Sequence, residues 1–367
     1  MKMTTLSKVV LGAAALVQGQ QVLVKEDPVQ DQCLALVLGG GGSASAYEAG
    51  YLWALLNDDT PEQVATGKYA YDAVTGVSGG GINALAIAAW PKGGEKELAD
   101  WLSTTWGALH TKEVFTLWPG WDPIGHGIFD ETGVVDDSPL LVYLTAVLKE
   151  IGDAHGHSFH RMINIDAMDA ISGSLIAFTE ASVPYDDFAK VAVASASLPG
   201  LFPARKLGDW LFIDGGVVWG ADLARGIQRC REVVSDDSKI IVDMLITHSS
   251  SKDTLEKRSD SALANYYRAK NIKDWENGVA GLRKFVDDFP DITYRHFAIP
   301  SKPIGPGPTR LDFEGSFTTP MADLGRVDGK RDLGKPEGQN WKRFSEWSDM
   351  PADEKKKVSL ADYIHQM

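Results

Sequence analysis

Two short, mainly apolar runs, each followed by a glycine-rich turn and a helical pattern, constrain the fold of this chain more than any other feature. Residues 34–38 are all apolar and lead into four consecutive glycines, after which the apolar side chains of residues 45–56 have near-helical spacing. Residues 73–77 form the second run, which enters a serine and three glycines before the alanine-rich residues 82–90. An uninterrupted apolar run is typical of a parallel strand that helices cover on both faces. These patterns predict a layered α/β fold.

The rest of the chain predicts further elements of both kinds. Residues 140–151 have the pattern of an amphipathic helix, and residues 162–165 and 174–178 that of paired strands joined by a turn at Gly173. Between residues 101 and 129, tryptophans are mixed with glycines and prolines, so we expect a loop-rich cap rather than a regular element. We also expect a helix at 188–197 and strands at 210–213 and 239–247.

Composition and charge exclude several classes of fold and partner. With 44% hydrophobic and 23% charged residues, the chain is neither collagen-like, disordered nor a coiled coil. The formal charge of −14 disfavours a nucleic-acid partner and a strongly anionic membrane, because both bind proteins through clustered Lys and Arg. It leaves a neutral or zwitterionic lipid surface open as a partner. The two cysteines, Cys33 and Cys230, are too few for a thiolate zinc site.

The first 19 residues have the features of a cleavable signal peptide. Two lysines accompany the uncharged, mostly apolar residues 9–17, a run too short to span a bilayer. We therefore expect a secreted or endomembrane-lumen protein, with an amphipathic or buried N-terminal helix as the alternative. The expected divisions are a signal peptide at 1–19, a linker at 20–33, one domain at 34–333 and a charged tail at 334–367 that wraps the domain surface or is partly mobile.

The order of the predicted elements carries both cysteines to the edge of the sheet opposite the glycine turns. Cys33 directly precedes the first strand, and Cys230 lies in the helix expected after Asp214. In an oxidising compartment the two thiols could pair. The bonded and the reduced states both remain open.

A serine in the second glycine turn has the surroundings of a catalytic nucleophile. Within residues 76–80, Ser78 stands between a strand and a helix, with glycines two positions before and two after it. The turn at such a site is sharp and closely packed, so flanking side chains would clash. It exposes the hydroxyl at a helix N-terminus, where the helix dipole stabilises a developing anion. The alternative is a tight turn with an incidental serine.

The first glycine turn, at residues 39–42, supplies successive backbone N–H groups that form an anion-binding nest. Acyl transfer needs such donors for the oxyanion of its tetrahedral intermediate. Gly39, Gly41 and Ala44 also fit the dinucleotide fingerprint, which would make the chain a nucleotide-binding oxidoreductase. That fingerprint requires an acidic residue ~20 positions on, at the end of the next strand. Here the next strand ends at Ser78, so we disfavour this alternative.

An aspartate after the predicted strand at 210–213 is a candidate general base. Asp214 is followed by two glycines and can take the proton of Ser78 directly. Taken alone, a turn aspartate that caps the next helix is the more common role. The order Ser78, Asp214, then His248 or His296 also matches a Ser-His-Asp triad. The motifs favour His248 as an ordinary polar loop residue.

Taken in order, these motifs resemble the patatin-like phospholipase family over about residues 34–333. The blocks that carry the resemblance are residues 36–50, 76–80, 194–203 and 211–217. The resemblance implies a three-layer α/β/α fold with a mainly parallel central sheet, and a Ser–Asp dyad that works without histidine. By position it implies the nucleophile Ser78, the general base Asp214, the oxyanion-hole residues Gly40, Gly41 and Gly42, and the Gly79 N–H as a helper.

The sequence departs from the family pattern at two places. Ala44-Ser45 stands where members usually carry an Arg-Gly pair, which leaves the electrostatics of the loop and the head-group preference open. Trp219-Gly220 stands where the family often has an Asn before a Pro. We interpret the second change as local packing variation.

The resulting prediction is a lipid acyl hydrolase of the phospholipase A or lysophospholipase type. Such a serine esterase cleaves fatty acyl esters of phospholipids or other lipids by two-step acyl transfer. The Trp-rich segment 101–129 suits an acyl chain and a lipid–water interface, although core packing is an equal alternative for Trp118 and Trp121. No Asp-x-Asp-x-Asp-Gly calcium loop occurs, so we expect no metal and no other cofactor. The alternative function is a catalytically weak lipid-binding or storage protein on the same fold.

Overall fold

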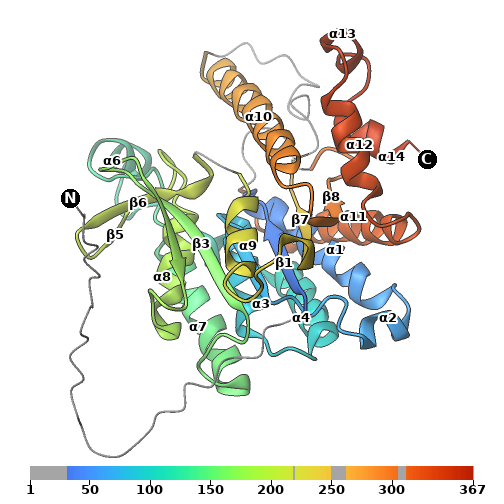
Figure 1. The fold of residues 1–367 in the computed structure, drawn as a ribbon. Helices are drawn as coiled ribbons and strands as arrows, with labels where there is room; N and C mark the ends of the chain where they lie inside the picture. The colour runs from blue at the N-terminus through green and yellow to red at the C-terminus, as the bar shows by residue number, and fades with distance from the viewer. Residues whose placement is uncertain (1–30, 218–219, 249–261, 305–310, 367) are drawn as a thin grey trace, which may run out of the picture.

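The centre of the molecule is one mixed sheet (Figure 1). The computed structural model describes residues 31–217, 220–248, 262–304 and 311–366, so the predicted signal peptide and most of the predicted linker lie outside the described residues. Within them the sheet has eight strands in the order β5-β6-β3-β2-β1-β7-β8, with β4 paired to β3. The strands are β1 (Cys33–Leu38), β2 (Ala73–Val77), β3 (Met162–Asp169), β4 (Leu175–Thr179), β5 (Arg205–Leu207), β6 (Trp210–Asp214), β7 (Ile240–Leu245) and β8 (Thr293–Ala298).

The parallel strands define two edges of the sheet. β1 pairs in parallel with β2 and β7, β2 with β3, and β7 with β8. Antiparallel pairing joins β3 to β4 and β6, and β6 to β5. The ends of β1, β2 and β7 therefore meet at one edge, which we call the carboxyl edge, and their starts meet at the amino edge. Both glycine-rich turns lie at the carboxyl edge, as the two strand–turn–helix patterns predicted.

Helices cover both faces of the sheet, which gives three layers. The alternation of side chains along β1 shows why. Leu36 and Leu38 belong to a core shared with α1, α3, α4, α7 and α8, whereas Ala35 and Val37 belong to a second core with α9 and α12. The helices are α1 (Ala46–Asn57), α2 (Pro61–Ala65), α3 (Gly79–Ala89), α4 (Glu95–Ala108), α5 (Thr111–Val114), α6 (Pro123–Phe129), α7 (Ser138–His155), α8 (Phe188–Ser195), α9 (Leu223–Cys230), α10 (Ala262–Asp288), α11 (Gly315–Leu333), α12 (Gln339–Ser348), α13 (Ala352–Lys355) and α14 (Leu360–His365). None of the helices in the described part of the chain has a stretch long and apolar enough to cross a bilayer.

The Trp-rich segment 101–129 is more regular at its start than the sequence predicted. Its first residues complete helix α4, and the buried Leu98, Leu102 and Trp106 of that helix recur every four residues. The glycines and prolines that indicated loops are concentrated after this helix. The loop-rich part therefore begins near Leu109 rather than at Trp101, and it contains only the short helices α5 and α6 before α7.

Residues 334–366 also differ from the expected surface wrap or partly mobile tail, because they pack on the sheet. Trp341 and Phe344 of α12 are buried against β8, and Asn340 Nδ2 donates to the Phe297 carbonyl of that strand at 3.0 Å. In Figure 1, α12 and α14 lie beside α11 and β8. The many charged residues of this segment obscured the two aromatic side chains, which are three positions apart. That spacing indicates a buried helix face only when a strand is known to lie against it.

Side-chain bonds hold the amino edge together. Cys33, the first residue of β1, and Cys230, the last residue of α9, form a disulfide, which is one of the two states that the sequence left open. Asp72 Oδ2, directly before β2, accepts the Leu34 N–H at 2.9 Å. The buried Arg161 directly precedes β3. These bonds connect the starts of neighbouring strands to one another and to the helices.

Candidate active site

Ser78 occupies the sharp turn between β2 and α3 that its flanking glycines predicted. Its φ of 55° makes it the one non-glycine residue with positive φ among the described residues. A Cβ on Gly76 would overlap the Gly80 carbonyl, and a Cβ on Gly80 would lie 2.7 Å from the Leu38 oxygen. The chain can turn this tightly only because both positions lack a side chain. A strained backbone that its surroundings hold in place is typical of a functional site.

Two serines near the end of α8 hold the backbones of both candidate catalytic residues. The Ser78 N–H donates to Ser195 Oγ at 2.8 Å, and the Ser195 hydroxyl donates in turn to the Asp166 carbonyl of β3 at 2.7 Å. The Asp214 N–H donates to the Ser197 carbonyl at 2.9 Å. Neither serine was predicted to have a role from the sequence. The only signal for them was that both lie in the block at residues 194–203 that resembles the family.

Asp214 ends β6, and the strand register places it beside Ser78 on one side of β3. Val77 pairs with Asp166 of β3, and the next residue of β3, Ala167, pairs with Asp214. Strand β4 occupies the other side of β3, so the ends of β2 and β6 meet on the same side, and a Cβ on Gly215 would lie only 3.3 Å from Val77 Cγ1. The Asp214 side chain is buried, and its Oδ1 accepts the Gly216 N–H at 2.7 Å.

The first glycine turn lies directly against Ser78. A Cβ on Gly40 would be 3.1 Å from the Ser78 Cβ. The Gly40 N–H donates to the Gly220 carbonyl at 2.7 Å, so in this conformation it points to the protein and not to an oxyanion. The resemblance implied that Gly40 belongs to the oxyanion hole. The residue that engages its amide instead, Gly220, is far away in the sequence. The amides of this region that have no acceptor among the described residues are those of Gly41, Gly42 and Gly79.

Thr247, which follows β7, fixes the glycine turn from its other side. Its hydroxyl donates to the Gly40 carbonyl at 2.6 Å, and a Cβ on Gly41 would lie 2.8 Å from the Thr247 Cβ. The Gly39 N–H continues the β1–β7 ladder by donating to the Leu245 carbonyl at 2.9 Å. The position of the first glycine turn thus depends on β7, which follows it in the sequence by some two hundred residues.

A buried polar chain supports the turn from behind. Asn83 Nδ2 donates to Glu48 Oε2 at 2.8 Å and to the Ser45 carbonyl at 3.0 Å, and Trp106 Nε1 donates to Asn83 Oδ1 at 2.8 Å. Burial raises the pKa of Glu48 well above its usual range. The negative charge of Glu48, which would oppose an oxyanion nearby, is therefore disfavoured.

A second buried carboxyl lies in β3, the strand that both candidate catalytic residues adjoin. Burial and the charge of Asp222 raise the pKa of Asp166 to about 7. Arg225 Nε is 4.0 Å from Asp166 Oδ1. In the described part of the chain, no three His, Cys, Asp or Glu side chains gather closely enough to share a metal ion.

Comparison with known proteins agrees with this arrangement. The family model for patatin-like phospholipases matches residues 36–224, which is more than half of the chain. The chain belongs to this family. Membership places it among lipid acyl hydrolases in general and confirms the three-layer fold with a mainly parallel sheet. Among solved structures, VipD from Legionella pneumophila is similar at 12% sequence identity and a TM-score of 0.37, over 91% of this chain and 74% of that chain. No curated protein matches the sequence.

In this patatin-like phospholipase the histidines lie apart from the Ser78–Asp214 row. His248 follows β7, and its Nδ1 is 3.4 Å from the Thr247 hydroxyl. The register puts Asp214 beside Ser78 at β3, whereas His248 follows a strand two places away from β2, on the side of β1. A triad histidine must lie between the serine and the acid. His296 is buried in β8, farther out in the sheet.

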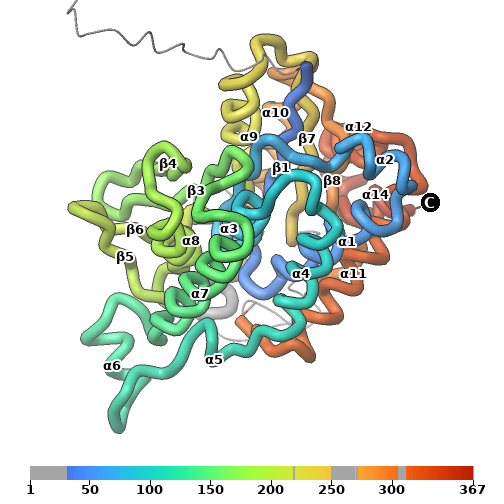
Figure 2. Tube along the Cα trace, turned by 90° about the horizontal axis from the view of Figure 1, so that it is seen from below, coloured from blue at the N-terminus to red at the C-terminus, as the bar shows by residue number. Residues whose placement is uncertain are grey.

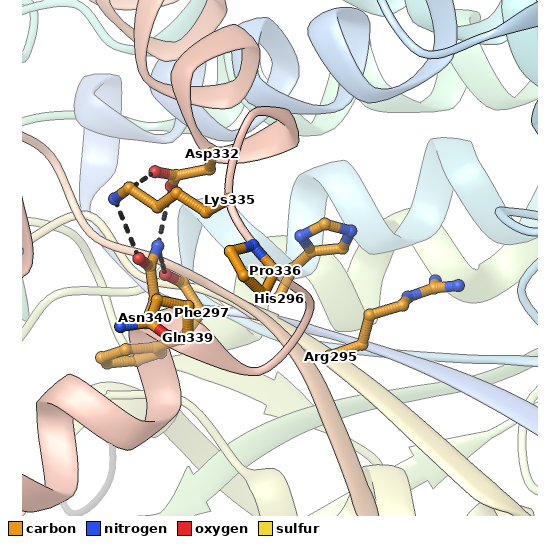
Figure 3. A pocket seen from close by; sticks show the side chains of 8 residues that line it. All are labelled: Arg295, His296, Phe297, Asp332, Lys335, Pro336, Gln339 and Asn340. Atoms are coloured by element: carbon orange, nitrogen blue, oxygen red, sulfur yellow. Dashed lines mark hydrogen bonds and ion pairs between the residues drawn. The ribbon is translucent and has the colours of Figure 1, made fainter.

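A small polar pocket of this patatin-like phospholipase lies at β8, the strand at one end of the sheet (Figure 3). Lys335 Nζ donates to Asn340 Oδ1 at 3.0 Å and pairs with Asp332 at 2.9 Å. The free volume of about 10 Å³ is room for little more than one water molecule. The pocket therefore belongs to the packing of α12 on the sheet. Its lining residues are Arg295, His296, Phe297, Asp332, Lys335, Pro336, Gln339 and Asn340.

Proposed function

We propose that this patatin-like phospholipase cleaves fatty acyl esters of phospholipids or related lipids, with Ser78 as nucleophile and Asp214 as its general base. The observation that carries the proposal is the register, which brings these two residues next to each other on one side of β3. The glycine turn at residues 39–42 supports it, because it packs on Ser78 with amide groups left for an anion. The family match supports the substrate class.

The reaction proceeds by two acyl transfers. In the first, the Asp214 carboxylate accepts the proton of the Ser78 hydroxyl while Oγ attacks the ester carbonyl carbon. The tetrahedral oxyanion is stabilised by the amides of Gly41, Gly42 and Gly79, the last of which begins helix α3. The C–O bond to the alcohol breaks, and Asp214 returns the proton to the leaving oxygen. In the second transfer, Asp214 accepts a proton from water while the water oxygen attacks the acyl carbon. The bond between that carbon and Ser78 Oγ then breaks, Asp214 returns the proton to Oγ, and the fatty acid leaves.

The strand order argues for a dyad rather than a triad. Asp214 lies beside Ser78 at β3, whereas β7, the strand that His248 follows, is about two strand spacings or ~10 Å from β2 on the side away from β3. A relay in which one histidine touches both the serine and the acid would need that histidine on the Asp214 side of Ser78. Direct proton transfer from Ser78 to Asp214 requires no third side chain.

We also propose that the enzyme works after secretion or in an endomembrane lumen and contacts neutral or zwitterionic membranes. The predicted signal peptide at residues 1–19 motivates the location, and the Cys33–Cys230 disulfide supports it because such bonds persist in oxidising compartments. The formal charge of −14 supports the choice of lipid surface.

Hydrolysis of a short-chain p-nitrophenyl ester by two single variants tests the mechanism. Asp214→Asn is expected to lower kcat/KM by at least about 10³-fold, whereas His248→Ala stays within about twofold of the unmodified chain. The reverse pattern would establish a histidine triad. Labelling with a fluorophosphonate, followed by mass spectrometry, is expected to modify Ser78. A folded protein with neither label nor turnover would instead support a catalytically weak lipid-binding protein on this fold.

A further inference from the structure

A projecting segment beside the antiparallel end of the sheet exposes an unusual number of large apolar side chains. We call residues 116–136, which contain α6, the α6 arm. Its base is closed by two hydrogen bonds between Thr116 and Asp136, from N to O in each direction, at 2.8 and 2.9 Å. Trp121 is 97% exposed and Phe129 is 84% exposed. The other exposed large apolar residues of the arm are Leu117, Ile124 and Ile128.

The α6 arm is folded, so these side chains project from a defined structure. Trp118 is partly buried, and its Nε1 donates to the Gly133 carbonyl at 2.9 Å. Asp122 caps α6 by accepting the Gly125 N–H at 3.0 Å. Of the two tryptophans that core packing could have explained, only Trp118 packs inward. A folded segment that turns Trp121 and Phe129 outward is typical of a surface that meets an apolar partner.

Backbone contacts join the α6 arm to the acid side of the active site. Gly133 forms a bridge with Gly200, and the Val135 N–H donates to the Leu201 carbonyl at 3.1 Å. Residues 200–201 lie only three and four positions after Ser197, whose carbonyl holds Asp214. Leu198, between them, is exposed. Exposed apolar residues therefore occur both on the arm and beside the catalytic aspartate, and Figures 1 and 2 both show α6 on the β5–β6 side of the molecule.

Charge on the α6 arm selects the kind of partner. Residues 116–136 contain no Lys or Arg and four acidic residues. The one histidine of the arm, His126, pairs with Asp130 at 3.0 Å and with Glu131 at 3.4 Å. An anionic lipid surface would be repelled, whereas aromatic and aliphatic side chains favour the interface of an uncharged one.

We propose that the α6 arm is the membrane-docking element of this enzyme. It inserts Trp121, Phe129 and their apolar neighbours into the interface of a zwitterionic phospholipid bilayer and presents the carboxyl edge of the sheet to the lipid. The choice of a lipid as occupant rests on the proposed function, because a hydrolase of membrane lipids must bring its nucleophile to the bilayer surface. The docking itself needs no catalysis and can be measured without it.

The test uses the full chain carrying Ser78→Ala, so that the lipid stays intact during the measurement. Cosedimentation with phosphatidylcholine vesicles gives the lipid concentration at half-maximal binding. Adding Trp121→Ser and Phe129→Ser is expected to raise that concentration at least tenfold. The matched control is Val327→Ser, a change of an apolar residue that is 59% exposed to the same polar residue, and it is expected to change binding less than twofold. Val327 belongs to α11, a helix on the other side of the molecule from α6 (Figure 1).

Three results would overturn the docking proposal. They are unchanged binding in the arm variant, no binding of the unmodified arm to phosphatidylcholine, and tighter binding when phosphatidylglycerol replaces part of the phosphatidylcholine. The last two would indicate, respectively, that the arm binds an apolar protein partner and that charge selects anionic lipid. Failure of the proposed function has a different readout, because hydrolysis of a soluble ester would then persist in Ser78→Ala. That result would not affect the interpretation of the vesicle-binding measurement. With Ser78 present, the arm variant is expected to lower the ratio of vesicle to soluble-ester hydrolysis at least tenfold.

Discussion

The two edges of the central sheet are built in opposite ways. At the carboxyl edge the chain turns where side chains are missing. Gly76 and Gly80 have no room for a Cβ, Gly40 packs on the Ser78 Cβ, and Ser78 itself has a positive φ. The shape of this edge depends on close backbone contacts that any added methyl group would break.

At the amino edge the chain is joined by side chains that are present. The Cys33–Cys230 disulfide connects β1 to α9. Buried Arg161 donates to the Ile87 carbonyl at 2.9 Å and pairs with Glu95 at 2.6 Å, which connects the start of β3 to α3 and α4. The comparison shows that stabilising side-chain bonds at the amino edge offset backbone strain at the carboxyl edge. We therefore expect an added side-chain atom to destabilise the carboxyl edge, and the loss of a side-chain bond to destabilise the amino edge.

The largest effect is expected from an addition at the carboxyl edge. Gly76→Ala puts a methyl group into the Gly80 carbonyl, which cannot move without displacing the start of α3. We expect the free energy of unfolding to fall by about 4 kcal/mol or more, and ester hydrolysis by the remaining folded protein to be lost. Gly278→Ala, in α10 where a Cβ meets no atom within 4 Å, is the control, and urea unfolding should show it unchanged or slightly stabilised. Equal losses in both variants would refute the contrast.

A slightly smaller effect is expected from removing the disulfide at the amino edge. Its cysteines are 197 positions apart, so the bond restricts a long loop of the unfolded chain. We expect Cys33→Ala combined with Cys230→Ala to lower the free energy of unfolding by about 3 kcal/mol, while kcat/KM at 25 °C stays near that of the unmodified chain. Dithiothreitol should lower the melting temperature of the unmodified chain only. A melting temperature of the unmodified chain that dithiothreitol leaves unchanged would contradict the prediction.

Removing the buried guanidinium of Arg161 should lower the free energy of unfolding by about as much as removing the disulfide does. Arg161→Met removes the guanidinium that the Ile87 carbonyl and the Glu95 carboxylate share, so we expect the free energy of unfolding in guanidinium chloride to fall by about 3 kcal/mol. Lys149→Met breaks the exposed pair with Asp153 on α7 and should cost less than about 1 kcal/mol. If the two variants were equally stable, the amino edge would not hold the stability that we assign to it.

A pH-dependent effect of about 2 kcal/mol is expected from the buried carboxyl of β3. The pKa of Asp166 is about 7 in the folded chain and ~3.8 when unfolded, so the folded state holds a proton that the unfolded state has lost. Stability from this group is therefore greatest below pH 4 and falls by about 2 kcal/mol between pH 5 and pH 7. Asp166→Asn should remove that fall in urea melts at the two pH values. The same slope in Asp166→Asn would assign it to another group.

The smallest predicted effect has the opposite sign. Ser78→Gly relieves the positive φ at the turn, so we expect it to stabilise the chain by about 1 kcal/mol relative to Ser78→Ala. Both variants lack the nucleophile that we propose and should not hydrolyse esters. Differential scanning calorimetry of the pair separates strain from chemistry, and a glycine variant less stable than the alanine variant would show that the turn is not strained.

The parts of this molecule that could be predicted from sequence are those whose causes are local. The apolar runs at residues 34–38 and 73–77, each ending in glycines, predicted two strands, their turns and the helices after them. Ser78 and Asp214 could be chosen because each stands where a predicted strand meets glycines. The structure brings them together on one side of β3, although β2 runs parallel to β3 and β6 runs antiparallel to it.

What could not be predicted depends on partners far along the chain. The Gly40 amide donates to the Gly220 carbonyl, and no local sequence pattern predicts a hydrogen bond to a residue 180 positions away. Ser195 and Ser197 gain their roles only from the register of α8 against β2 and β6. In α12, Trp341 and Phe344 stand in a highly charged stretch, and their burial needs β8 beside them.

The match to the family ends at residue 224, yet β7 and Thr247 come after it. Because β7 pairs with β1 along its length and Thr247 holds the Gly40 carbonyl, a nascent chain shorter than 247 residues has its serine and aspartate but an unfinished anion cradle. Synthesis from the N-terminus thus delays the assembly of the catalytic apparatus until most of the polypeptide has been made.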